Sequence, residues 1–112
     1  MKWYISKIVF RISAENTQQK PQFDEQLRLI AADSAEEAFF KARAIGIGEE
    51  DSFLNDKLNT VRWEFINVSE VVPVKGLEDG VEIYSQIHET EEARSYIHCV
   101  HQKAIFLRTQ TK

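Results

Sequence analysis

The sequence predicts an α+β fold: a two-layer sandwich in which two helices cover one face of a four-stranded, mostly antiparallel sheet. Four segments show the alternation of side chains that is typical of half-buried strands, and two show helical signals, in the order β-β-α-β-β-α. The 112 residues fit one compact domain. We therefore expect residues 1–112 to form a single domain, with residues 90–112 as a C-terminal helical extension.

The first two predicted strands span Lys2–Ser13 and Phe23–Asp33, joined by a polar loop from Ala14 to Gln22. In the first strand, Lys7 and Arg11 indicate the more solvent-exposed side. In the second strand, one side carries Phe23, Leu27, Leu29 and Ala31, and the other carries Asp24, Gln26, Arg28 and Ile30.

A helix is predicted from Ala35 to about Ile45. Ser34 is a typical N-cap residue, and a glutamate follows three positions later as in a capping box. Two glycines, Gly46 and Gly48, are expected to end the helix as C-cap residues. The acidic run Glu49–Ser52 lacks EF-hand spacing and is interpreted as a solvated loop.

The third and fourth strands are predicted at Val61–Val74 and Val81–Ile87. Apolar residues at Val61, Trp63 and Phe65 should face inward. The turn signal Glu78-Asp79-Gly80 should bring these two strands into a hairpin, because Gly80 can adopt a positive φ. A last helix should begin after Thr90 and run to about Arg108.

Composition and charge restrict the class of protein. Fourteen basic and eighteen acidic residues give a net charge of −4, which does not favour nucleic acid or an anionic membrane as a partner. A single cysteine, Cys99, excludes an intrachain disulfide and favours the cytoplasm. Neither a signal peptide nor a membrane span is expected, because polar residues interrupt every apolar stretch.

Three stretches together carry a family resemblance. These are Trp3-Tyr4 with Lys7, the run from Phe23-Asp24-Glu25-Gln26 to Ala32-Asp33-Ser34-Ala35-Glu36-Glu37-Ala38, and Val61-Arg62-Trp63-Glu64-Phe65-Ile66 followed by Leu77-Glu78-Asp79-Gly80-Val81-Glu82-Ile83-Tyr84-Ser85. From about residue 2 to 87 the chain resembles the domain of unknown function 4288 family, a group of small prokaryotic proteins. The resemblance implies a compact stand-alone domain and lends no catalytic residues. The last helix departs from the family's shorter pattern.

The sequence contains none of the familiar motifs for phosphate, dinucleotide, zinc or acyl chemistry, and no cofactor is expected. His98 and His101 are three residues apart and share a helix face, but two imidazoles make an incomplete metal site. We interpret them as surface histidines beside a half-buried Cys99. Cys99 is not expected to be a nucleophile, because adjacent helix positions point about 100° apart and no dyad with His98 can form.

A polar sheet face is the first candidate site. Alternation predicts that this face collects Lys7, Arg11, Asp24, Gln26, Arg28, Arg62, Glu64, Glu82, Tyr84, Gln86 and His88. From this set, the candidate ligand-binding residues are Lys7, Arg28, Arg62, Tyr84 and His88. A solvated face with cross-strand ion pairs is the alternative interpretation.

The last helix is the second candidate, because its apolar set is wider than one face of a small sandwich needs. The candidate interface residues are Tyr96, Val100, Ile105 and Phe106. We therefore predict a non-enzymatic protein-binding or self-assembly module, acting as a homodimer or with another protein through this helix or the open sheet face. The alternative is a small-ligand sensor or enzyme with a pocket formed by Arg28, Arg62, Tyr84 and His88.

Overall fold

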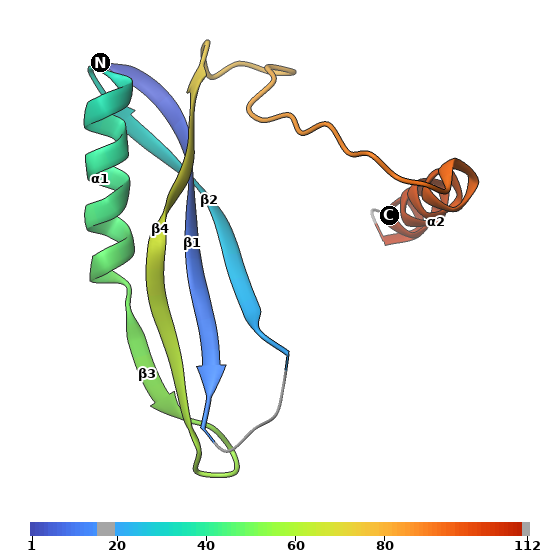
Figure 1. The fold of residues 1–112 in the computed structure, drawn as a ribbon. Helices are drawn as coiled ribbons and strands as arrows, with labels where there is room; N and C mark the ends of the chain where they lie inside the picture. Colours follow the sequence, from blue (N-terminus) through green and yellow to red (C-terminus); the bar gives the residue numbers. More distant parts are fainter. Residues whose placement is uncertain (16–19, 111–112) are drawn as a thin grey trace.

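The computed structural model describes residues 1–15 and 20–110, and it contains one four-stranded antiparallel sheet with strand order β2-β1-β4-β3 (Figure 1). Its elements are β1 (Lys2–Ala14), β2 (Gln22–Ala32), α1 (Ala35–Gly48), β3 (Asp51–Leu54), β4 (Thr60–Val74) and α2 (Ala93–Gln110). The α+β class and the order β-β-α-β-β-α are confirmed. The predicted loop between Ala14 and Gln22 includes residues 16–19, which lie outside the described residues.

The core lies between α1 and one face of the sheet. β1 is central and pairs with β2 on one side and β4 on the other. Alternate residues of β1 point toward α1, which places Tyr4, Ile8 and Phe10 in the core. They pack with Ile30, Ala32, Ala38, Ala42 and Val68. We call the opposite side of the sheet the open face.

The N-terminus of α1 forms the predicted capping box. The Glu37 backbone N–H donates to Ser34 Oγ at 3.1 Å, and the Asp33 backbone N–H donates to Glu37 Oε2 at 3.1 Å. Each side chain thereby satisfies an otherwise unpaired backbone donor.

The C-terminus of α1 differs from the prediction, because Gly46 lies inside the helix, Gly48 is its last helical residue, and the C-cap residue is Glu49. Gly46 marks a close approach between α1 and the sheet. A Cβ atom at this position would lie 3.0 Å from Ile8 Cγ2 and closer still to the Phe65 ring. The glycine therefore serves packing and does not provide a left-handed C-cap.

The strand predicted at Val81–Ile87 does not form, and the sheet takes its remaining strand from an earlier segment. Val81–Ile87 forms no strand, although the preceding turn exists, with φ of 85° at Gly80. Instead, β3 at Asp51–Leu54 pairs with the start of β4. The Asn55 side chain stabilises the short β3–β4 connection by accepting bonds from the backbone N–H groups of Lys57 and Asn59. β3 and β4 are neighbours in the chain and form a short hairpin. β3 therefore occupies the place beside β4 that was expected for Val81–Ile87.

The second helix, α2, contacts none of the other helices and strands within the described residues, so α1 alone covers the sheet. The segment from Lys75 to Glu92, which we call the linker, joins β4 to α2 (Figure 1). In the described part of the chain, no helix is long and apolar enough to cross a bilayer.

The two sides of β2 are exchanged relative to the expected arrangement, so that its polar side faces α1 and its apolar side faces outward. Paired residues of neighbouring strands share a face, and Gln26 pairs with the core residue Ile8 whereas Leu27 pairs with Lys7. Asp24, Gln26 and Arg28 therefore lie on the α1 side, and the expectation that they join Lys7 on one polar face is wrong. The apolar residues Phe23, Leu27 and Leu29 lie on the open face.

Candidate functional site

Lys7 is the centre of the densest polar cluster on the open face. Its ammonium group lies 2.9 Å from a carboxylate oxygen of Glu70 and 3.3 Å from one of Glu25. Only 13% of the Lys7 side chain is exposed. Lys7 and Glu70 meet because they are directly paired on β1 and β4, so the sheet register itself builds this ion pair.

Tyr84 brings the linker into this cluster. Its hydroxyl donates a hydrogen bond of 2.7 Å to Glu70 Oε2, and the Lys7 ammonium lies 5.3 Å from the centre of its ring. The Tyr84 side chain and Glu70 raise the pKa of Lys7 far above its ordinary range, and Lys7 and the Tyr84 hydroxyl lower the pKa of Glu70. The cluster is therefore suited to hold the linker on the sheet, because Lys7 stays protonated and Glu70 ionised at neutral pH.

Arg28 lies on the other side of the sheet from Lys7. Its guanidinium group binds Glu49, just beyond the end of α1, through both terminal nitrogens and also donates to Gln26 Oε1. Gln26 in turn donates to Asp24, which also accepts a hydrogen bond of 3.1 Å from Trp63 Nε1. These bonds fix the end of α1 against β2.

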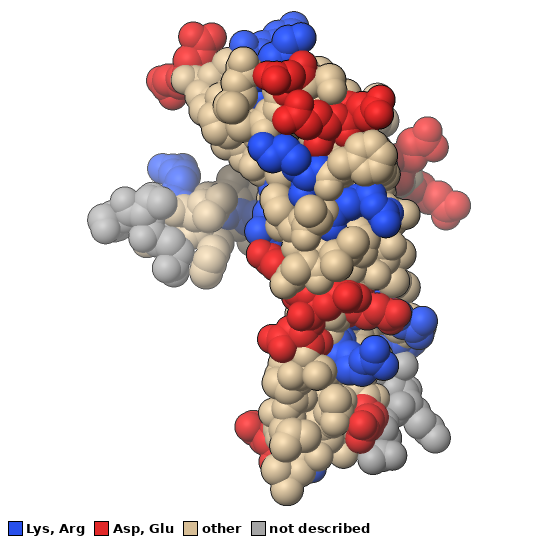
Figure 2. Space-filling model, turned by 90° about the vertical axis from the view of Figure 1, so that its left-hand side faces the viewer, with Lys and Arg blue, Asp and Glu red and all other residues tan. Residues whose placement is uncertain are grey.

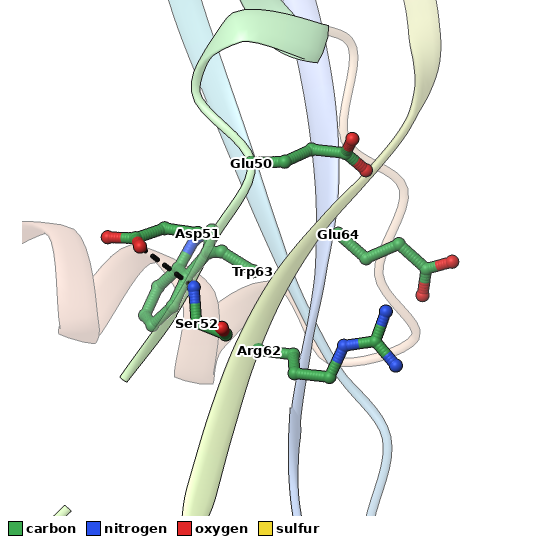
Figure 3. Close-up of a pocket in the computed structure, with 6 residues that line it drawn as sticks. All are labelled: Glu50, Asp51, Ser52, Arg62, Trp63 and Glu64. Atoms are coloured by element: carbon green, nitrogen blue, oxygen red, sulfur yellow. Dashed lines mark hydrogen bonds between the residues drawn. The ribbon is translucent and has the colours of Figure 1, made fainter. Parts of the chain in front are cut away.

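Arg62 borders a hollow of about 380 Å³ between β3 and β4. The lining residues are Glu50, Asp51, Ser52, Arg62, Trp63 and Glu64 (Figure 3). Asp51 and Trp63 point to one side of the strand pair, and Arg62 and Glu64 point to the other. The lining is thus spread over two faces. Arg62 is paired with Ser13, six positions along β1 from Lys7, or about 20 Å away along the strand.

His88 lies in the linker and stacks on Tyr96 of α2, with ring centres 5.3 Å apart and planes 16° apart. The structure therefore does not bring the five predicted ligand-binding residues together. Lys7 and Tyr84 are in contact, whereas Arg28 is on the α1 side, Arg62 is at the far end of β4, and His88 contacts α2.

The His98, Cys99 and His101 cluster lies on α2. Cys99 is exposed and not half-buried as expected, because α2 packs on no other element within the described residues. The described residues contain no group of three or more His, Cys, Asp or Glu placed to hold a metal ion.

The interface candidates on α2 fall on different sides of the helix. Successive helical residues are about 100° apart, so Tyr96 and Val100 share a face with Ala93, Ile97, Ala104 and Leu107. We call these six residues the α2 stripe. Phe106 and Ile105 lie on either side of the stripe, each about 130° from its centre. Tyr96, Val100, Ile105 and Phe106 are all about half exposed or more.

The sequence reasoning missed a second apolar surface. Trp3, Phe23, Leu27 and Leu29, which we call the β2 patch, are exposed on the open face. The alternation predicts which β2 residues share a side but does not determine which side faces the helix. The pairing of Ile30 with Tyr4 was the missing signal, because it sets which side meets α1. Glu70 was also missed, since its role depends on its pairing with Lys7.

The four-stranded sheet with one packed helix and a tethered linker defines a small α+β domain. The chain belongs to the DUF4288 family, domain of unknown function, whose model matches residues 3–85. The match includes the Lys7–Glu70–Tyr84 cluster and ends before α2. Neither the curated proteins nor the solved structures contain a match to the chain.

Proposed function

We propose that this protein is a non-enzymatic protein-binding or self-assembly module, and that α2 is its docking element. The observation that carries the proposal is the α2 stripe, an apolar face that packs against no other element within the described residues. Most of the stability of a helix in a protein comes from packing of its apolar face, so α2 gains stability from a surface on which this face is buried.

Two surfaces of the rest of the molecule differ in how well they suit an interaction. The side that carries α1 and β3 shows acidic and basic side chains interspersed, as on an ordinary solvated surface (Figure 2). The β2 patch, by contrast, is apolar and exposed, which is typical of interaction surfaces. The single cysteine supports a role in the cytoplasm, where thiols remain reduced.

Light scattering on the intact chain and on a chain truncated after Glu89 tests the proposal. The truncation leaves the sheet and α1 intact, because neither contacts α2. We expect the intact chain to form a species larger than its 13.0 kDa monomer and the truncated chain to be monomeric. Monomers in both cases would rule out self-assembly through α2.

A further inference from the structure

We propose that the α2 stripe of one copy packs on the β2 patch of a second copy, and that the second copy returns its own α2 to the first. This inference rests on the proposed function and names the partner: another molecule of the same chain. The product is a symmetric dimer with exchanged C-terminal helices.

The receiving surface is formed by the inverted side of β2. In an antiparallel sheet with one solvated face, polar residues are expected to face the water. Here Leu27 and Leu29 of β2 face outward next to Lys7 and Ile5 of β1. They remain 47% and 46% exposed, so the linker does not cover them as it follows the β4 side of this face. β2 therefore offers an exposed apolar surface that neither helix covers within the described residues.

The α2 stripe is comparable to this surface in length. The 18 residues of α2 extend over about 27 Å, and the 11 residues of β2 over about 36 Å. The stripe has a width of about 100°, as in a helix that packs on a sheet through one face. Two such contacts in one dimer are needed to approach the roughly 1,600 Å² that stable interfaces bury.

Charge favours docking on the body of another copy over pairing of two α2 helices. From Ala93 onward the chain has four basic residues, Arg94, Lys103, Arg108 and Lys112, and no acidic residue. Residues 1–92 contain ten basic and all eighteen acidic residues. Two α2 helices would repel each other, whereas α2 and the acidic body attract.

The linker favours a second copy over the same chain. Tyr84 is held on the sheet by Glu70 and Lys7, and His88 is stacked on Tyr96 in the first turns of α2. Only three residues separate Tyr84 from His88. With the stack kept, only the three residues between Tyr84 and His88 could turn α2 back to the β2 patch of its own chain. Docking in a second copy retains both contacts.

Cross-linking between two differently labelled preparations tests this arrangement. The first carries Leu27→Cys together with Cys99→Ser, which places its single thiol in the β2 patch. The second is the wild-type chain with an affinity tag and its native Cys99, which is exposed on α2 beside the stripe. Treatment of the mixture with a short bismaleimide should yield a covalent dimer containing one chain of each kind. As a matched control, Phe40→Cys with Cys99→Ser places an equally exposed thiol on α1 and should yield no such dimer.

The alternatives give different products. If tagged chains link only to each other through Cys99, α2 pairs with α2, which overturns this inference but leaves the proposed function intact. A Leu27→Cys chain that retains Cys99 and links within itself as a monomer would show docking in the same chain, and both proposals would fail. A monomeric preparation without any mixed product would likewise overturn the exchanged dimer.

Discussion

Gly46 is a residue at which α1 lies close to the sheet, and the space around it determines which side chain the position accepts. An added methyl group would meet the ring of Phe65 and a methyl group of Ile8. Both neighbours belong to the packed core, where inserted methyl groups force shifts of side chains and backbone.

Gly46→Ala should therefore destabilise the fold by about 1 to 3 kcal/mol, because overpacking outweighs the better helix propensity of alanine. Gly48→Ala is the matched control in the same helix, where the added methyl group would meet no atom within 4 Å. It should be neutral or stabilise the fold by up to about 1 kcal/mol. Urea unfolding of both variants measures the difference, and equal effects would contradict the close approach of α1 and β4.

At the residue level, much of the core could be predicted from the sequence. Tyr4, Ile8 and Phe10 share one side of β1 opposite Lys7, and this side is the buried one. The role of Gly46 could not be predicted. A glycine near a helix end is compatible with both a C-cap and a close contact, and only the position of Phe65 distinguishes them.

At the element level, the linker is held by charge as well as by packing. Glu70 has its pKa lowered from the ordinary value of 4.5, so its contribution is present above 4.5 and is lost as the pH falls below that value. Lys7 has its pKa raised, so its contribution is complete below its ordinary 10.5. Between these two values, the linker should remain on the sheet.

Acidification to well below pH 4.5 should release Tyr84 from the sheet, because protonated Glu70 accepts more weakly from the Tyr84 hydroxyl and no longer attracts Lys7. NMR signals of the Tyr84 ring measure this change, since the ring leaves the neighbourhood of Lys7. Glu70→Gln should release the ring already at neutral pH, whereas Glu78→Gln in the nearby turn should behave as the wild type. Tyr84 signals that stay unchanged in the acidified, still folded wild type would refute the charge-dependent tether.

Elements with strong local signals were predicted accurately. Ser34 and Glu37 mark the start of α1, and Thr60–Val74 differs from the predicted strand by one residue at its start. Val81–Ile87 has the composition of a strand but forms none, because β4 already pairs with β1 and with β3. The choice between Asp51–Leu54 and Val81–Ile87 as the partner of β4 depends on competition between segments, which composition does not determine.

At the level of the whole molecule, the division of charge follows the division of structure. The sheet and α1 belong to the family match over residues 3–85, and the acidic residues lie in or near this part. The basic α2 lies beyond it. The prediction of an interface helix from its wide apolar set remains a prediction, and the exposed α2 stripe and β2 patch are the reasons to pursue it.

The molar mass of three proteins, measured by light scattering over a range of concentrations, tests the exchanged dimer most directly. The wild type should approach twice its 13.0 kDa mass, and Val100→Asp should raise the dissociation constant more than about tenfold, because it places a charge within the α2 stripe. Ile105→Asp, about 140° around the same helix from Val100 and similarly exposed, should dimerise like the wild type. A wild type that stays monomeric, or equal weakening by both variants, would contradict docking through the α2 stripe.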